Sequence, residues 1–129
     1  MFERKDIAKL KKDIVLDVEL FDSNLKLHTR WGTFSPRALD DGTKLLMKYF
    51  SADIDDVCLD LGCGYGPIGL ALAKHCSKGE VHMVDKDFVA VDLANYNAKL
   101  NNIFNAKAYL SDAFLQVPSD IKFNQIVSN

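Results

Sequence analysis

Glycine and aspartate stand close together in the stretch CLDLGCGYGPIG, residues 58–69. Asp60 lies within an apolar run, and Gly62, Gly64 and Gly66 follow it at alternate positions. Glycine lets the backbone adopt positive φ angles and approach a ligand closely. In a parallel sheet, ligands bind beyond the carboxyl ends of the strands, where the following helices direct their N-termini. The stretch therefore predicts a turn that binds a nucleotide-like ligand, in preference to a turn that only joins a strand to a helix.

The aspartate indicates which nucleotide fits this turn. Gly64, Gly66 and Gly69 match the GxGxxG pattern of dinucleotide-binding proteins, which by itself is weak evidence. Asp60 argues against a dinucleotide, because a carboxylate two residues before the turn repels a pyrophosphate and attracts an ammonium group. S-adenosylmethionine has an adenosine, a methionine ammonium and no phosphate. It is therefore the ligand that the stretch predicts.

Two further acids follow the next two apolar segments. Asp85 ends the run VHMVD, the position from which an acid in this architecture accepts hydrogen bonds from ribose hydroxyls. Asp112, in YLSDAF, could accept a hydrogen bond from an adenine amino group while the backbone of Ala113 contacts the edge of the ring. Each acid alone could instead be a helix N-cap or a loop residue. Together with Asp60, at the ends of three successive strands, they predict one continuous ligand site.

The elements that must position these residues form an alternating pattern of strands and helices. Short apolar segments predict strands at 57–61, 81–84, 107–110 and 125–128. The pattern indicates an α/β fold with a Rossmann-like parallel sheet wound through right-handed crossovers. The first crossover helix has Pro67 in its opening turn. The residues expected on the core sides of the two helices are Ile68, Leu72 and Cys76 in the first, and Val89, Leu93, Tyr96 and Leu100 in the second.

The N-terminal part has a different pattern. Mixed charges around two apolar residues predict a short amphipathic helix at 3–12. Alternating polarity in 14–20 and 25–31, on either side of a DSN turn at 22–24, predicts a hairpin with one buried face. A further helix is expected to begin at Asp40 or Asp41. Without a linker or repeat, we expect a single domain at 1–129, with an extension at 1–36 and a cofactor-binding half at 37–129.

Composition limits the class of protein and its partners. The chain has 129 residues, 48% of them apolar, and a formal net charge of -2, so a strongly basic nucleic-acid-binding protein is excluded. Lys26, His28 and Arg30 could form a local patch that contacts phosphates, although a solvated sheet face is the alternative. There is no apolar run of about 18 residues and no apolar stretch near the charged start. We therefore expect a cytoplasmic protein without a membrane partner.

Cysteine and histidine show no spacing typical of a metal site. The three cysteines lack a CxxC pair, which indicates reduced thiols and no zinc. Cys63 lies inside the glycine turn but has no matched histidine or acid partner, so we interpret it as a small packing residue and not as a nucleophile. His75 and His82 are expected to be surface residues.

These motifs resemble those of class I S-adenosylmethionine-dependent methyltransferases, with DLGCGYG, VDKD and SDAF as the first three. GTFSPRALDDGTKLL, residues 32–46, is similar to the stretch before the first motif in the methyltransferase small domain family. That family includes enzymes that methylate the exocyclic amine of guanine in small-subunit ribosomal RNA. The resemblance implies that this segment closes over the cofactor, with Ser35 and Gly42 near it. It implies the cofactor-binding residues Phe34, Thr43, Asp60, Gly62, Cys63, Gly64, Gly66, Asp85, Lys86, Asp112 and Ala113.

The same resemblance implies a catalytic residue at the end of the chain. Such enzymes carry an Asn-Pro-Pro-aromatic loop after the fourth strand, whose asparagine orients the target amine. The chain stops at QIVSN, so Ser128 and Asn129 would begin that loop, and the alternative for Asn129 is an inert chain end. We expect the cofactor-binding half of a methyltransferase. Its last strand would then form an exposed edge that favours self-association.

The implied reaction is an in-line displacement in which a nitrogen attacks the methyl group of the cofactor, with no metal required. The partner that the resemblance implies is an RNA substrate, with ribosomal RNA as the first candidate. Two alternatives stay open: a protein glutamine or a small molecule as the acceptor, or a module that binds cofactor or nucleic acid without turnover.

Overall fold

The computed structural model describes residues 14–20, 23–30 and 51–128. The expected helices at 3–12 and from Asp40 or Asp41 lie outside these residues, and so do five candidate residues: Phe34, Ser35, Gly42, Thr43 and Asn129. The described elements are β1 (Ile14–Leu20), β2 (Ser23–Thr29), β3 (Val57–Leu61), α3 (Pro67–His75), β4 (Glu80–Asp85), α4 (Phe88–Leu100), β5 (Ala106–Leu110) and β6 (Gln125–Ser128).

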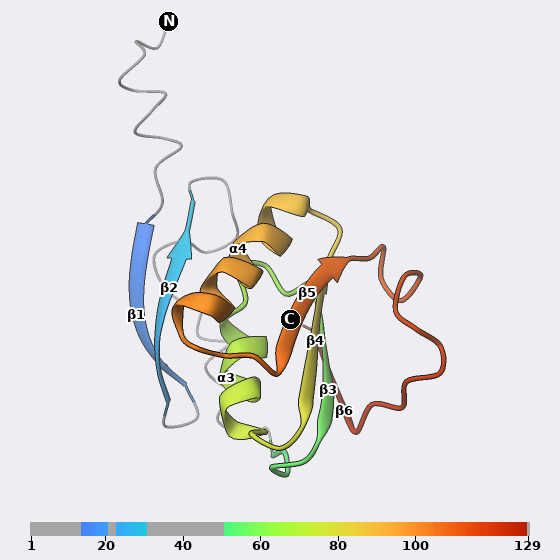
Figure 1. Ribbon diagram of the computed structural model, residues 1–129. Helices are drawn as coiled ribbons and strands as arrows, with labels where there is room; N and C mark the ends of the chain where they lie inside the picture. Colours follow the sequence, from blue (N-terminus) through green and yellow to red (C-terminus); the bar gives the residue numbers. More distant parts are fainter. Residues whose placement is uncertain (1–13, 21–22, 31–50, 129) are drawn as a thin grey trace, which may run out of the picture.

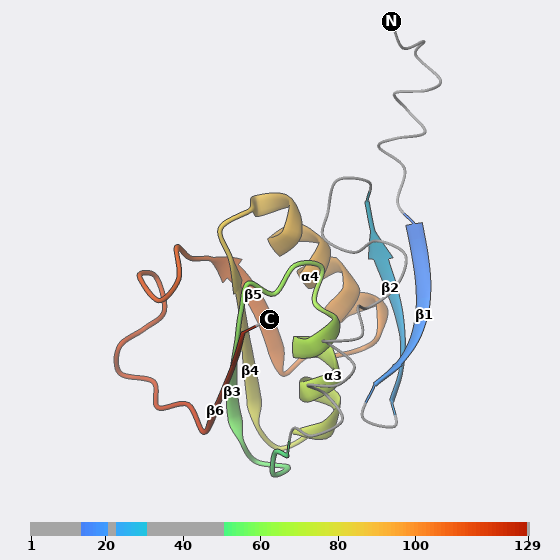
Figure 2. The ribbon, with the colours of Figure 1, turned by 180° about the vertical axis from the view of Figure 1, so that it is seen from behind.

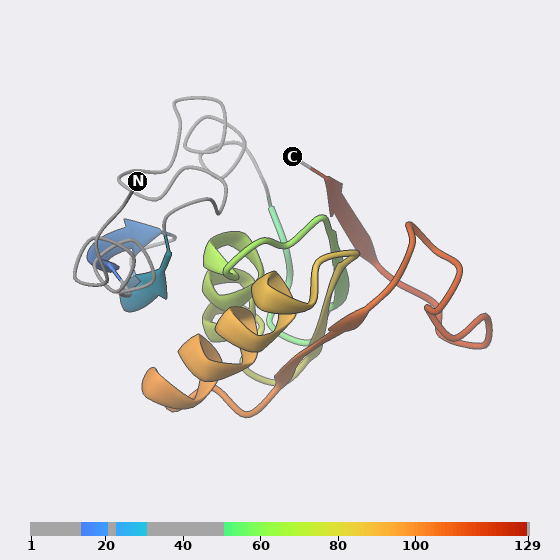
Figure 3. The same ribbon diagram turned by 90° about the horizontal axis from the view of Figure 1, so that it is seen from above.

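Four strands form a parallel sheet in the order β5-β4-β3-β6. Helix α3 connects β3 to β4, helix α4 connects β4 to β5, and both cover the same face of the sheet (Figures 1 and 3). The order of connection reverses between β3 and β6, and open α/β sheets bind ligands at such a reversal, beyond the carboxyl ends of the strands. The expected α/β fold with a Rossmann-like parallel sheet is confirmed.

The N-terminal hairpin packs on the helices and not on the sheet (Figure 3). Its strands pair antiparallel, and the alternation of the sequence buries Leu25, Leu27 and Thr29 of β2. Helix α3 lies between hairpin and sheet, so every residue from Pro67 to Ala73 is buried. The described part of the chain therefore has three layers: hairpin, helices and parallel sheet.

The observed bounds agree closely with the expected strands. β3 and β6 match, whereas β4 and β5 begin one residue earlier and β4 also includes Asp85. The expected DSN turn at 22–24 is wrong for Ser23 and Asn24. Both belong to β2, where Ser23 pairs with Leu20 and Asn24 with Glu19. β6 lies at an edge of the sheet, beside β3 (Figure 2). Of the helices that the structure describes, neither is both long and apolar enough to cross a membrane.

The core side of α4 differs from the expected one. Leu93 is buried as expected, but Tyr96 and Leu100 are 48% and 38% exposed. Helix α4 contacts both the parallel sheet and β2. The side of the helix that lies between them is rich in alanine, which lets the backbones of neighbouring elements approach closely. The buried residues of α4 are Ala90, Val91, Leu93, Ala94, Asn97 and Ala98.

The expectation that His82 is a surface residue is wrong. Its side chain is fully buried on β4, with Nδ1 2.8 Å from the hydroxyl of Tyr109 and Nε2 2.8 Å from Oε1 of Glu80. The ring of Phe123 packs edge-on against it, with 5.4 Å between the centroids. These partners satisfy both ring nitrogens, so His82 is a hydrogen-bonded core residue. His75 is exposed, as expected.

Candidate cofactor-binding site

The turn between β3 and α3 has three glycines with positive φ angles. The angle is 71° at Gly62, 57° at Gly64 and 99° at Gly66. A Cβ atom at Gly62 or Gly64 would meet no atom of the described residues within 4 Å. At Gly66 it would lie 3.3 Å from the Cβ of Ala94, where the turn meets α4. Glycine therefore serves backbone conformation at all three positions, and the described residues leave space above the first two.

The backbone of this turn is held from β4. The carbonyl oxygen of Val84 accepts hydrogen bonds from the N–H groups of Gly62 and Cys63, at 2.8 and 2.9 Å. The N–H of Gly64 donates to Oδ2 of Asp85 at 3.0 Å. Because each of these donors is paired within the chain, the hydrogen bonds define the shape of the turn.

Asp85 lies at the carboxyl end of β4, where the sequence placed it. Its other oxygen, Oδ1, accepts a hydrogen bond from the N–H of Asp87 at 3.0 Å. The side chain is half-buried, and a carboxylate has about four lone-pair positions, so two bonds remain available to a ligand. Two backbone donors thus fix the orientation of a carboxylate that still faces the turn.

Asp60 is buried, with an exposed fraction of 2%, and its carboxylate faces helix α3. Oδ2 accepts a hydrogen bond of 3.1 Å from the N–H of Gly69, in the first turn of the helix. Gly66, the N-cap residue, has no side chain for this purpose, so Asp60 supplies the missing acceptor from the neighbouring strand. One oxygen of the carboxylate that the sequence assigned to a ligand ammonium therefore also has a structural bond.

Electrostatics around Asp60 oppose its ionisation. Burial raises the pKa of its carboxyl group to about 7, the hydrogen bond from Gly69 lowers it, and the negative charge of Asp85 raises it further. Within the described part of the chain, no lysine, arginine or histidine is among the groups that shift this pKa. Among the described residues, the one charged side chain that shifts the pKa of Asp60 is therefore a second acid, Asp85.

Gly69 has a packing role that its place in the GxGxxG pattern only partly indicates. A Cβ atom there would lie 2.6 Å from Sδ of Met83 and 3.1 Å from Oδ2 of Asp60. Only glycine lets α3 lie this close to the sheet while its N–H reaches the Asp60 carboxylate. The fourth glycine of the stretch thus fixes helix and acid relative to each other.

The third acid lies in a compact loop after β5. Asp112 is exposed, its N–H donates to Oε1 of Gln116 at 2.7 Å, and its carbonyl accepts from Leu115. Ala113 has a φ of 50°, which is unusual for a residue with a Cβ atom. The hydroxyl of Ser111 donates to the carbonyl of Ala113 and helps to hold it there. Asp112 and Ala113 thus lie beyond the carboxyl end of β5, at the same edge as Asp60 and Asp85.

The remaining candidates on this edge differ in exposure. Lys86 is exposed and directly follows Asp85. Cys63 is buried in the turn, and burial, followed by the charges of Asp60 and Asp85, raises the pKa of its thiol. A thiol that stays neutral is a poor nucleophile, in agreement with a packing role. All three described cysteines are free and buried.

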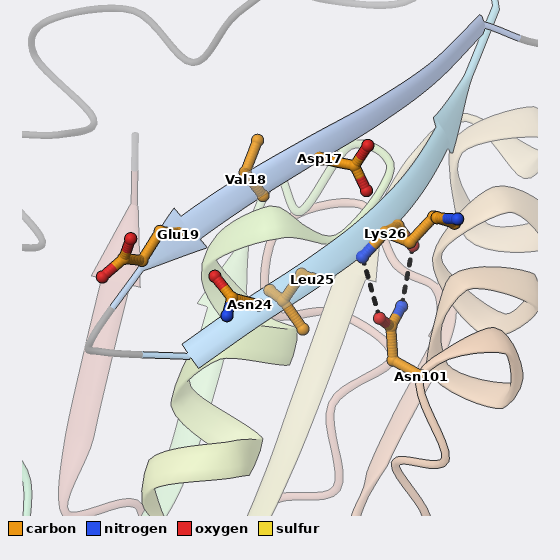
Figure 4. A pocket seen from close by; sticks show the side chains of 7 residues that line it. All are labelled: Asp17, Val18, Glu19, Asn24, Leu25, Lys26 and Asn101. Atoms are coloured by element: carbon orange, nitrogen blue, oxygen red, sulfur yellow. Dashed lines mark hydrogen bonds between the residues drawn. The ribbon is translucent and has the colours of Figure 1, made fainter.

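The suggested basic patch on the hairpin is interrupted by an acid. Lys26 is exposed but lies directly opposite Asp17 of β1, as Figure 4 shows. His28 is half-buried, and its ring packs edge-on against Tyr96, with 4.9 Å between the centroids. This arrangement favours a solvated face of mixed charge over a continuous positive stripe.

Asn97 is a residue at this site that the sequence analysis missed. It is fully buried on α4, and its Nδ2 donates to the carbonyl of Tyr65, inside the glycine turn, at 2.8 Å. Its position one turn after Leu93, on the buried side of the helix, was the available signal. A buried amide among apolar neighbours requires partners, and here one of them belongs to the turn.

Comparison with known proteins agrees with this geometry. The sequence model of the family described as "Methyltransferase small domain" matches residues 24–129. The Bacillus subtilis protein YbxB is 43% identical over 99 residues, which cover 76% of this chain and 49% of that protein. Ribosomal RNA small subunit methyltransferase C of Haemophilus influenzae is 33% identical over 128 residues, 99% of this chain and 36% of that enzyme. The chain thus spans half or less of these relatives.

Among solved structures, a 16S rRNA N2 methyltransferase of T. thermophilus (RsmC), in complex with AdoMet and guanosine, superimposes with a TM-score of 0.82 at 25% identity. The alignment covers 91% of this chain and 32% of that one. The resemblance read from DLGCGYG, VDKD and SDAF is therefore confirmed. The chain belongs to the methyltransferase small domain family.

Proposed function

We propose that this chain is the cofactor-binding part of a methyltransferase that transfers a methyl group from S-adenosylmethionine to the exocyclic amine of guanine in ribosomal RNA. Membership of the family supports the cofactor and the reaction class. The relatives named ribosomal RNA small subunit methyltransferase C, and the RsmC complex with AdoMet and guanosine, support the acceptor. A ribosomal RNA substrate implies a cytoplasmic location.

The observation that carries the proposal is the buried carboxylate of Asp60 beside an open glycine turn. Buried charges in proteins are normally paired, because desolvation of an unpaired ion is costly. Among the described residues, the charged side chain that shifts the pKa of Asp60 is another acid, Asp85. A ligand ammonium would supply the missing positive charge, whereas a pyrophosphate would add a third negative group. The site therefore favours the methionine end of S-adenosylmethionine over a dinucleotide.

The other residues of the edge would bind the nucleoside. Asp85 would accept hydrogen bonds from the ribose hydroxyls, with Lys86 and Cys63 adjoining it. Asp112 would accept from the adenine amino group, and the backbone N–H of Ala113 would donate to the ring edge. Open space above Gly62 and Gly64 would let the ligand approach the backbone. Phe34 and Thr43 remain candidates that lie outside the described residues.

In this reaction the protein positions the two reactants and excludes water. Bound S-adenosylmethionine supplies a methyl group on a good sulfonium leaving group. The residues of this chain would position the bound cofactor for direct attack by the acceptor nitrogen, a displacement that requires no nucleophilic side chain. Asn129 is the candidate for orienting the target amine, and it lies outside the described residues.

Two measurements test this function. Calorimetry should show binding of S-adenosylmethionine and no binding of NAD, and transfer of labelled methyl groups should be detected on ribosomal RNA. Labelling of a protein or a small molecule alone would change the acceptor. Binding without transfer to any acceptor would indicate a binding module. Preference for NAD would refute the assignment of the cofactor.

A further inference from the structure

Asn97 of α4 and Asn101, the C-cap residue of that helix, continue the hydrogen bonding of strand β2. Oδ1 of Asn97 accepts from the N–H of His28 at 2.7 Å, and its Nδ2 donates to the carbonyl of His28 at 2.9 Å. Asn101, one helical turn later, makes the same pair of bonds with Lys26, at 2.9 and 2.8 Å (Figure 4). A side-chain amide has the donor and acceptor of a peptide group. The two asparagines thus cover the edge of β2 as a neighbouring strand would.

The third hydrogen bond distinguishes the two asparagines. Nδ2 of Asn101 donates to the carbonyl of Asn97, within its own helix, at 2.7 Å. Nδ2 of Asn97 instead donates to the carbonyl of Tyr65, at 2.8 Å. Tyr65 lies between Gly64 and Gly66 in the candidate cofactor turn. Only the first of the two asparagines therefore joins the hairpin to the turn.

This bond holds the turn from α4, in addition to the bonds that hold it from β4. Val84 and Asp85 hold Gly62, Cys63 and Gly64 through their N–H groups. The buried Tyr65 carbonyl accepts from α4, where Asn97 is fully buried and both hydrogens of its Nδ2 are in use. Glycine on each side offers little resistance to rotation of the Tyr65 peptide groups. The N–H of the peptide group that joins Tyr65 to Gly66 donates to the carbonyl of Cys63 at 3.1 Å, and the Asn97 amide adds a second restraint, from α4, at its carbonyl oxygen.

We infer that Asn97 is a positioning residue for cofactor binding, which acts by fixing the Tyr65 peptide groups, and that the N-terminal hairpin is a structural part of the cofactor site. The inference rests on the proposed function, because it takes the glycine turn to be the cofactor contact. It follows that ligand binding at the turn and hydrogen bonding at His28 are coupled, and such coupling is reciprocal.

The test compares Asn97→Ala with Asn101→Ala in the full chain. Each variant loses three side-chain hydrogen bonds, two of them to the β2 backbone, so both should unfold at lower temperature. Loss of one restraining hydrogen bond should make binding of S-adenosylmethionine to Asn97→Ala about five- to tenfold weaker by calorimetry. Asn101→Ala should bind within about twofold of the wild type. Equal loss of affinity in both variants, or an unchanged affinity in folded Asn97→Ala, would overturn the inference.

Amide hydrogen exchange of the wild-type chain gives an independent readout, which decides the question if Asn97→Ala does not fold. Saturating S-adenosylmethionine should slow exchange of the His28 N–H at least about threefold, because its acceptor becomes more rigid, and should leave the Lys26 N–H unchanged. Equal slowing of exchange at both N–H groups, or no slowing at either, would contradict the coupling. Failure of the wild type to bind S-adenosylmethionine would instead remove the proposed function and this inference with it.

Discussion

Replacement of Asp60 by asparagine should stabilise the empty protein and weaken its binding of S-adenosylmethionine. The pKa of the Asp60 carboxyl group is raised from 3.8 to about 7, chiefly by burial. Because the folded pKa is the higher one, the folded state binds the proton more tightly than the unfolded state. The contribution of Asp60 to the free energy of unfolding therefore falls as pH rises from about 4 to about 7, and is constant above about pH 7.

The size of this effect follows from the shift. About three pKa units, at about 1.36 kcal/mol each, correspond to a cost of about 4 kcal/mol for the ionised carboxylate above pH 7. The asparagine of the Asp60→Asn variant would remove this cost, and its amide oxygen could still accept the hydrogen bond from Gly69. The pKa of about 7 already includes the hydrogen bond from Gly69, which stabilises the charged form. The expected gain in the free energy of unfolding at pH 8 is therefore up to about 4 kcal/mol, falling toward zero at pH 4, where the folded wild type carries a neutral carboxyl group.

Urea unfolding of both proteins between pH 4 and pH 8 measures the stability difference. Calorimetry should show that Asp60→Asn binds S-adenosylmethionine about 10- to 150-fold more weakly at pH 7.5, because a hydrogen-bonded charge pair is lost. Wild-type affinity should fall about tenfold per pH unit below pH 7, as Asp60 takes up a proton, and the variant should lack this dependence. Asp112→Asn, at an exposed acid, is the control for stability at each pH.

Two results would refute this reasoning. If Asp60→Asn is less stable than the wild type at pH 8, the carboxylate stabilises the fold, so its charge needs no ligand to explain it. If the variant binds S-adenosylmethionine as tightly as the wild type, the carboxylate does not contact the ammonium group. Either result would leave the choice of cofactor resting on the family comparison alone.

Three further predictions concern other parts of the site and the sheet. Asp85→Asn should weaken binding of S-adenosylmethionine by about 10- to 100-fold, and should abolish the preference for the cofactor over its 2′-deoxy analogue, measured by calorimetry. Gly69→Ala should destabilise the protein by about 1–3 kcal/mol in urea, because its Cβ atom meets Met83, and a Met83→Ala background should remove most of the loss. Light scattering at micromolar concentration should detect self-association through the edge strand β6, and Ile126→Lys, at a residue 52% exposed, should reduce it.

Local patterns predicted the strands and the edge at which the acids gather. Alternating polarity gave the buried side of β2, and the apolar segments gave β3 and β6 with their observed bounds. Because parallel strands end at one edge of a sheet, Asp60, Asp85 and Asp112 could be grouped without knowledge of any contact. What these predictions share is that each depends on residues close in the sequence and on a general rule of topology.

The errors concern contacts between distant segments. Tyr96 was expected in the core because its spacing from Leu93 fits a helix face. The buried side of α4 is instead centred on Asn97, and Tyr96 lies beside it, half exposed, with its ring against His28 of the hairpin. Burial of His82 depends on Tyr109 and Phe123, which lie far along the chain and have no local signal. Asn97 and the C-cap residue Asn101 did carry a signal, since polar residues at i and i+4 lie on the same side of a helix.

The role of Asp60 separates what the fold requires from what a ligand requires. The fold needs an acceptor at position 60, because the N–H of Gly69 is buried at the start of α3 and Gly66 cannot cap it. An uncharged amide would meet that need, so the charge is a cost to the empty protein. A cationic ligand offsets this cost and a phosphate increases it. The GxGxxG spacing is common to both ligand classes, so the buried charge next to it is the feature that selects between them.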